Sequence, residues 1–218
     1  MSFDVAIDWT NVIRTGDRTD TQHATLDLVA NADIATTAGG VMDIVQRFET
    51  PKVSGDGELG QMLQHTGQGI ASASVITRIA ADGSVVSSRI ENASDEDVRS
   101  IVGNLGQLIT FRYVRAEPVA VGDEWDKTWT DTATGAFETG AHYRLNEIVA
   151  CGASRCGVID VRGRDSDAKS SFRGQLVVEL DSLRPVSKHV ESIATSSGEQ
   201  EGTRYEVETK TILTAKRR

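Results

Sequence analysis

The side chains that could perform acid–base or metal chemistry are few, and none of them belongs to a known catalytic signature. Four histidines occur among 218 residues: His23, His65, His142 and His189. No H-E-x-x-H sequence supplies a zinc-protease site, and no G-x-S-x-G sequence supplies a nucleophilic serine. His23 and His142 could share a site if a repeat relates them, but ordinary strand positions are the simpler interpretation. We therefore expect a protein that is not an enzyme, with no catalytic residue, no metal site and no cofactor.

Two aspartates and a glycine-rich segment are further candidates for polar chemistry. Asp43 and Asp160 both lie inside apolar runs, which is compatible with a buried carboxylate pair or, more commonly, with the polar face of a strand. Gly55, Gly57 and Gly60 have the G-x-G-x-x-G spacing of a dinucleotide-binding loop. Because no buried parallel strand precedes them, we do not expect a phosphate-binding loop.

Cys151 and Cys156 are the only cysteines, and four residues separate them between two alternating runs. At the end of a hairpin they would face each other across the strands, at a separation that suits a disulfide. The alternative is a pair of reduced thiols in a cytosolic protein. We expect a disulfide, worth only about 2 kcal/mol because the closed loop is short. A disulfide in turn favours a periplasmic or extracellular location.

The charge distribution excludes several classes of partner. The chain has 23 Lys and Arg against 32 Asp and Glu, which gives a net charge of −9. The cationic residues are scattered except at 216–218, whereas nucleic acids and anionic bilayers require a clustered positive patch. No apolar run is long enough for a transmembrane helix. We expect no nucleic-acid partner and no membrane-spanning segment, and the oligomeric state is left open.

Alternation of apolar and polar residues predicts that most of the chain forms β-strands, arranged as antiparallel meanders. Residues 50–70 interrupt this pattern and predict a short helix or a flap. A second helix is predicted over 94–109, with Ser94 as N-cap and with close packing on a sheet at Gly103 and Gly106. One face of this helix is a continuous apolar stripe. The stripe includes Val98, Ile101, Leu105 and Leu108.

Three short echoes in the sequence predict two copies of one β unit. Residues 40–47 are similar to 157–164, residues 9–11 to 129–131, and residues 86–91 to 186–191, in the same order along the chain. One insertion between 47 and 86 accounts for the unequal spacing, although alternating strands also resemble one another by chance. We expect half-units at 1–114 and 115–218, fused into one domain. The expected fold is mainly β (α+β minor), a curved antiparallel sheet with one or two helices packed on it.

Residues 117–125 read Glu-Pro-Val-Ala-Val-Gly-Asp-Glu-Trp, and Tyr143, Leu145 and Ile148 follow. This arrangement resembles an uncharacterised family of bacterial exported lipoproteins with a mid-chain P-x-x-V-x-V-G-D-x-W segment, although no N-terminal lipid-attachment cysteine is present here. The pattern is also similar to periplasmic lipoprotein-carrier half-barrels, in which a curved sheet wraps helices over an apolar hollow. The resemblance implies an exported protein, with a lipid anchor in the full-length form left open.

The resulting hypothesis is a non-enzymatic protein that binds a hydrophobic or lipid-like ligand in a β half-barrel. Trp125 and Trp129 lie on one face of a strand and could line a pocket, although they serve equally as core anchors. The alternative is a structural or protein-interaction module of the cell envelope with a packed interior, whose partner would be another envelope protein. The expected ligand-binding residues are Val98, Ile101, Leu105, Leu108, Trp125 and Trp129.

Overall fold

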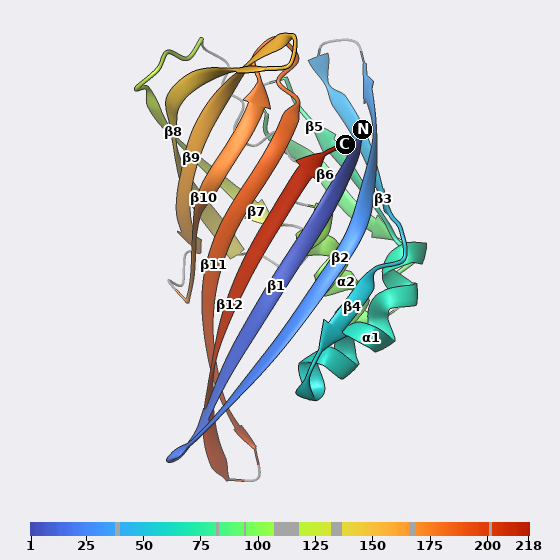
Figure 1. The fold of residues 1–218 in the computed structure, drawn as a ribbon, viewed down its shortest axis with the longest axis vertical. Coiled ribbons are helices and arrows are strands. Elements are labelled where there is room, and N and C mark those ends of the chain that lie inside the picture. Colours follow the sequence, from blue (N-terminus) through green and yellow to red (C-terminus); the bar gives the residue numbers. More distant parts are fainter. Residues whose placement is uncertain are drawn as a thin grey trace.

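A computed structural model describes residues 1–37, 40–81, 83–93, 95–106, 118–131, 137–165, 169–200 and 202–218. These residues form one open antiparallel sheet of twelve strands and two helices (Figure 1). The strand order across the sheet is β6-β5-β3-β2-β1-β12-β11-β10-β9-β8-β7, and β4 pairs with β2 beside this path. The predicted fold class, a mainly β protein with a curved antiparallel sheet and packed helices, is confirmed.

The two helices and six of the strands come from the first half of the chain. These elements are β1 (Ser2–Thr15), β2 (Arg18–Thr36), β3 (Met42–Phe48), β4 (Lys52–Gly55), α1 (Gly57–Ser72), β5 (Ser74–Ile79), β6 (Val85–Glu91) and α2 (Glu96–Gly106). The described part of the second half supplies strands alone: β7 (Glu124–Asp131), β8 (Phe137–Cys151), β9 (Ser154–Asp165), β10 (Ser170–Glu179), β11 (Pro185–Gln200) and β12 (Thr203–Arg217).

Two meanders of five strands follow the same order along the sheet. The first runs from β1 at the centre through β2, β3 and β5 to the edge at β6, and the second runs from the edge at β7 to β11 near the centre. Asp43 lies on the third strand of the first meander and Asp160 on the third strand of the second. The β4–α1 segment lies between the third and fourth strands, where the repeat requires an insertion. The strand order is thus the one expected of a duplication, whereas superposition of the half-units and their boundary stay predictions.

One face of the sheet is apolar and buried along nearly its whole width. Phe3, Val5 and Ile7 on β1 belong to the same core as Tyr143 on β8 and Leu176 on β10. The alternate residues of these strands form a polar face. In Figure 1 the edge strands β6 and β7 lie behind the central strands, so the sheet curves around its apolar face. Burial of this face supplies the main stabilisation of the fold, at roughly 1.5 to 3 kcal/mol for each large apolar side chain.

Helix α2 has a side-chain cap at its start and a hydrogen bond to the sheet at its end. At the start, Asp95 Oδ1 accepts hydrogen bonds from the backbone N–H groups of Asp97 (2.8 Å) and Val98 (3.3 Å), so Asp95 caps the helix. The predicted cap, Ser94, lies outside the described residues. At the other end, the buried side chain of Gln46 donates from Nε2 to the carbonyl of Gly106 at 2.8 Å.

Glycine allows this second end to approach the sheet closely. A Cβ atom on Gly106 would lie 2.8 Å from Cγ1 of Val75 on β5, so the predicted close packing at Gly106 is confirmed. Gly103 is buried within α2. The described helix ends at 106, and the predicted continuation to 109 lies outside the described residues.

Helix α1 occupies most of the segment 50–70, for which a short helix or a flap was predicted, so the helical alternative is confirmed. It has 16 residues and packs mainly on β2, β4 and α2. A Cβ atom on Gly60 would lie 2.5 Å from the backbone of Gly55, and Gly57 has a φ of +59°. The glycines of the G-x-G-x-x-G spacing therefore allow α1 to approach β4 closely. They also allow the left-handed backbone at Gly57, the first residue of α1. Neither helix is long and apolar enough to cross a membrane.

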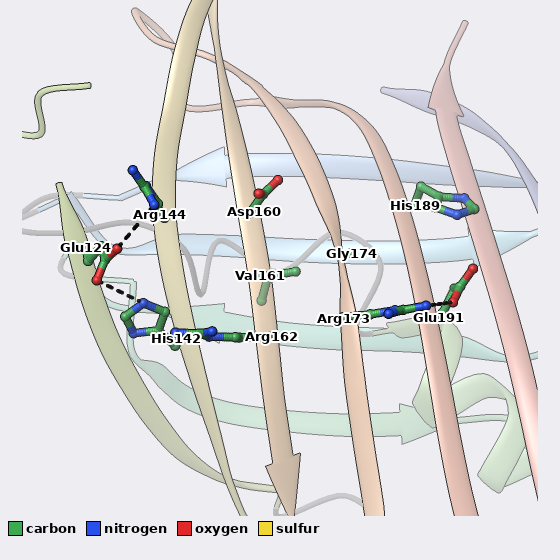
Figure 2. A pocket seen from close by; sticks show the side chains of 10 residues that line it. All are labelled: Glu124, His142, Arg144, Asp160, Val161, Arg162, Arg173, Gly174, His189 and Glu191. Carbon is green, nitrogen blue, oxygen red and sulfur yellow. Dashed lines mark hydrogen bonds and ion pairs between the residues drawn. The ribbon is translucent and has the colours of Figure 1, made fainter. Parts of the chain in front are cut away.

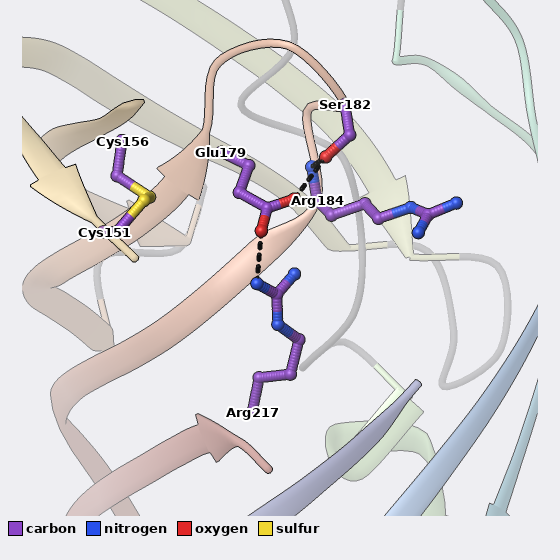
Figure 3. The surroundings of a disulfide bond; sticks show 6 residues. All are labelled: Cys151, Cys156, Glu179, Ser182, Arg184 and Arg217. Carbon is purple, nitrogen blue, oxygen red and sulfur yellow. Dashed lines mark hydrogen bonds and ion pairs between the residues drawn. A yellow bond between two sulfur atoms is a disulfide. The ribbon is translucent and has the colours of Figure 1, made fainter. Parts of the chain in front are cut away.

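Cys151 and Cys156 form the predicted disulfide (Figure 3), with a Cα–Cα distance of 5.8 Å. The hairpin between β8 and β9 turns through two residues, Gly152 and Ala153, and Gly152 has a φ of +66°. A four-residue loop between the cysteines, as their spacing had suggested, is thus wrong, because β8 runs up to Cys151 and β9 already begins at Ser154, two residues before Cys156. Cys151 lies opposite residue 154 and Cys156 opposite residue 149, so the disulfide crosses the hairpin diagonally.

Candidate functional site

The apolar stripe of α2 forms part of the protein core. Val98, Ile101 and Leu105 have exposed fractions of 3%, 9% and 0%, and all three belong to the continuous apolar core. Helix α2 packs on β5, β6 and α1. Leu108, the last residue predicted for the stripe, lies outside the described residues. The three described side chains therefore cover the sheet, as the helical spacing predicts.

Trp125 brings the second meander into the same core. Its ring stacks on Tyr143 with a centroid separation of 5.6 Å and an interplanar angle of 15°. The indole Nε1 of Trp125 is buried and has no hydrogen-bond partner among the described residues. A buried donor without an acceptor costs about 1 to 3 kcal/mol. The structure describes the backbone of Trp129 on β7, but its side chain lies outside the described part.

The two helices cover the apolar face unevenly. Their main contacts are with β2 to β6, all in the first half of the chain. The apolar face nevertheless continues across β7 to β10, where its residues remain buried. These residues include Trp125, Tyr143, Leu145, Ile159, Val161 and Leu176. The interior of the curved sheet is therefore one apolar region with a helix layer at one side.

A groove of about 470 Å³ crosses the polar face of the second meander, from β7 to β11 (Figure 2). The cross-strand pair Val161 and Gly174 lies between two rows of charged side chains. One row follows the register from Glu124 and Arg144 to Asp160 and His189. The other row contains His142, Arg162, Arg173 and Glu191.

At the β7 end of the groove, the ring of His142 lies between two carboxylates. His142 Nδ1 lies 2.9 Å from Asp126 Oδ1, and Nε2 lies 3.4 Å from Glu124 Oε2. Arg144 Nη1 lies 3.7 Å from the other oxygen of Glu124. The orientation of the His142 ring is therefore set by two neighbouring acids on β7.

The acids at the β9–β11 side of the groove also have partners. Arg173 Nη2 donates to Glu191 Oε2 at 3.1 Å, and this hydrogen bond is the main reason that the pKa of Glu191 lies below its usual range. Asp160 Oδ1 accepts a hydrogen bond from Gln175 at 3.2 Å. Arg162, between these groups, makes no hydrogen bond or ion pair with any residue that the structure describes.

The histidines do not assemble into a common site. His23 and His142 lie on β2 and β8, and five other strands lie between these two in the sheet order. His65 is exposed on α1, whereas His189 lines the groove together with His142. Within the described residues no three His, Cys, Asp or Glu side chains could hold a metal ion together. The idea of a symmetric site at His23 and His142 is thus wrong.

Asp43 and Asp160 lie on strands β3 and β9 and do not pair with each other. The Arg78 guanidinium binds both oxygens of Asp43, at 2.7 and 2.9 Å, and holds the pKa of that carboxyl below its usual range. The preferred interpretation of these aspartates, polar positions of strands, is confirmed. The groove was not predicted from the sequence, because its charged residues lie on five strands, β7 to β11, whose register is needed to align them.

No protein-family model matches this chain, and no curated protein is significantly similar to it. Among solved structures, the chain is similar to the crystal structure of a DUF1329 family protein from Desulfovibrio piger ATCC 29098. The identity is 10% and the TM-score is 0.25, over 98% of this chain and 82% of the other. A likeness of this size assigns neither a family nor a function, and the resemblance to exported lipoproteins and lipoprotein carriers stays a prediction.

Proposed function

We propose that this protein is a non-enzymatic, exported binding protein that takes up a hydrophobic or lipid-like ligand between its helices and the curved sheet. The observation that carries the proposal is the buried indole N–H of Trp125, which has no hydrogen-bond partner among the described residues and lies inside a continuous apolar core. The disulfide between Cys151 and Cys156 supports export, because such bonds persist in oxidising compartments.

The chemistry of the Trp125 environment defines the ligand. The stack with Tyr143 and the surrounding aliphatic side chains favour an apolar body, whereas the indole N–H requires an acceptor oxygen. An ester, carbonyl or carboxyl oxygen at one end of an alkyl chain would satisfy both requirements. The core side chains of α2 are at most 9% exposed, so uptake requires the helix layer to move away from the sheet.

The test replaces Trp125 by Phe, which keeps an aromatic ring and removes the N–H group. We expect binding of a fluorescent fatty acid to weaken by about tenfold, the equivalent of one hydrogen bond. We also expect the ligand-free variant to be as stable as the wild type, because an unsatisfied donor has been removed. Trp9→Phe on β1 is the matched control and should leave the affinity unchanged.

A structural or protein-interaction module is the second candidate, and a specific observation favours it. The described residues predicted to line the ligand site are buried in the core with no more than 9% exposure. A wild-type protein that takes up no fatty-acid probe would favour the interaction module over ligand uptake.

A further inference from the structure

We propose that the groove on the polar face of β7 to β11 is a second binding site, for a small molecule with a carboxylate or phosphate group, and that Arg162 is its principal anchor. This site is independent of the proposed hydrophobic ligand, because its side chains project from the opposite face of the sheet. The proposal depends on the pairing of the charged groups in the groove (Figure 2).

Arg162 is the arginine of the groove that has no carboxylate partner among the described residues. Arg144 and Arg173 each have a carboxylate partner, at 3.7 and 3.1 Å. Arg162 has no hydrogen bond or ion pair with the described residues, although it lies in the middle of the groove. A guanidinium offers a planar set of donors that matches a carboxylate or phosphate.

The register places a second arginine and a histidine beside Arg162. His142 lies opposite it on β8, and Arg173 lies opposite it on β10. Two arginines directly opposite each other on neighbouring strands repel, which destabilises the sheet. A bound oxyanion between Arg162 and Arg173 would remove this repulsion, so the arrangement favours an anion over water.

The acids that line the groove do not neutralise Arg162. Glu191 is bound to Arg173, Glu124 lies beside His142 and Arg144, and Asp160 accepts from Gln175. Three arginines and three acids line the groove, so its formal charge is zero, whereas the whole chain has a net charge of −9. An anion therefore meets less electrostatic repulsion at the groove than the net charge of the whole chain would produce.

The dimensions of the groove fit a small molecule. Its volume of about 470 Å³ lies within the range of small-molecule sites, roughly 300 to 1,000 Å³. The backbone of Gly174 lies between the two charged rows and carries no side chain there. The rows that flank it also contain carboxylates, so a ligand with one anionic group and neutral polar groups suits the lining better than a polyanion.

The test is calorimetric titration of the full chain with inorganic phosphate and, separately, with acetate, at constant ionic strength. We expect saturable binding of at least one anion. Arg162→Gln should weaken that binding by about tenfold or more, because a charge-assisted hydrogen bond is lost. Arg162→Lys should give an intermediate loss, because the charge stays but the planar fork is lost. Fatty-acid uptake should be unchanged in both variants.

Arg18→Gln provides the matched control, because Arg18 is also exposed and has no side-chain hydrogen bond or ion pair with the described residues, but it lies at the β1–β2 turn, outside the groove. It removes the same charge and should leave anion binding unchanged. Equal weakening by Arg18→Gln and Arg162→Gln would overturn the proposal, since it would indicate nonspecific attraction. Absence of saturable binding for both anions would overturn it as well, including the case in which phosphatidylglycerol vesicles bind and the soluble anions do not.

Discussion

The two meanders share a strand order but are stabilised by different means. The first meander has its apolar face covered by α1 and α2, which approach each other and the sheet at glycines. The second meander has no described helix of its own; it carries a disulfide at one hairpin and the charged groove on its polar face. One β architecture can thus carry helices on its apolar face in one half and a charged groove on its polar face in the other.

The contacts between the helices show how tightly the first half is packed. A Cβ atom on Gly69 of α1 would lie 2.6 Å from Cγ2 of Val98 on α2, a separation that packed atoms do not adopt. In the second half, the side-chain pairing is largely polar, as in the row of His142, Arg173 and Glu191. Substitutions in the first half should therefore alter stability more than substitutions in the groove.

The largest effect is expected from Leu105→Ala in the helix layer. Leu105 is completely buried, so its truncation should lower the free energy of unfolding by about 2 to 5 kcal/mol. Val86→Ala on β6 is the control; Val86 is 60% exposed, and its truncation should change stability by no more than about 0.5 kcal/mol. Urea unfolding followed by circular dichroism measures both. A loss for Leu105→Ala no larger than for Val86→Ala would mean that α2 does not contribute to the core.

The next effect belongs to the second half. The double variant Cys151→Ala with Cys156→Ala should lower the free energy of unfolding by about 2 kcal/mol, because the disulfide closes a short loop. A reducing agent should destabilise the wild type by a similar amount and leave the variant unchanged. A much larger loss would show that the second meander depends on this disulfide as strongly as the first depends on its helices.

A smaller effect tests the fit between the helices. Gly69→Ala should destabilise the protein by about 1 kcal/mol, because overpacking against Val98 outweighs the gain in helix propensity. Gly67→Ala in the same helix is the matched control. Its Cβ atom would lie 3.5 Å from Pro51, an ordinary contact, so it should be neutral or stabilise the helix by up to about 1 kcal/mol. Thermal unfolding measures both variants. A Gly69→Ala variant more stable than Gly67→Ala would show that α1 and α2 are not tightly packed at Gly69.

The smallest effect concerns pH and an ion pair between two strands of the second half. Figure 3 shows the ion pair of Glu179, the last residue of β10, with Arg217 on β12. The hydrogen bonds from Arg217 and then from the Ser182 hydroxyl hold the pKa of Glu179 below its usual range. Because the folded pKa is the lower one, this stabilisation is fully present above about pH 4.3 and is lost as the pH falls through the folded value.

Glu179→Gln provides the corresponding measurement. Between about pH 7 and about pH 3, the variant should lose less stability than the wild type, because one carboxylate no longer takes up a proton on unfolding. Identical pH dependence of the two proteins in urea unfolding would show that the Glu179–Arg217 pair contributes nothing to stability.

The sequence predicts the architecture well because alternation and helical spacing are local signals. The apolar stripe of Val98, Ile101 and Leu105 and the strand alternation around Phe3 each report burial without knowledge of distant contacts. The disulfide followed from the spacing of two cysteines. The tight turn at Gly152 was not predicted, because the end of each strand depends on the register of the hairpin.

The groove could not be predicted in the same way. Arg162 and Arg173 lie eleven residues apart in the sequence and become neighbours only through the register of β9 and β10. The indole N–H of Trp125 could not be predicted to lack an acceptor either. Whether the described residues offer one depends on every side chain around it, and these come from distant parts of the sequence. Polar chemistry on a sheet face therefore requires strand register, which a single sequence leaves undetermined.

The pairing of β1 with β12 has a consequence for how the chain folds. Phe3 on β1 pairs with Arg217 on β12, so the strand pair at the centre of the sheet, here called the central joint, connects residues from the two ends of the described chain. Each meander can form from local hairpins, but the joint closes only after β12 has been synthesised, and such long-range pairing is slow. Until then β1 presents an unpaired strand edge that can associate with other chains. A chaperone that binds this edge until β12 is available would therefore raise the yield of folded protein without altering its final stability.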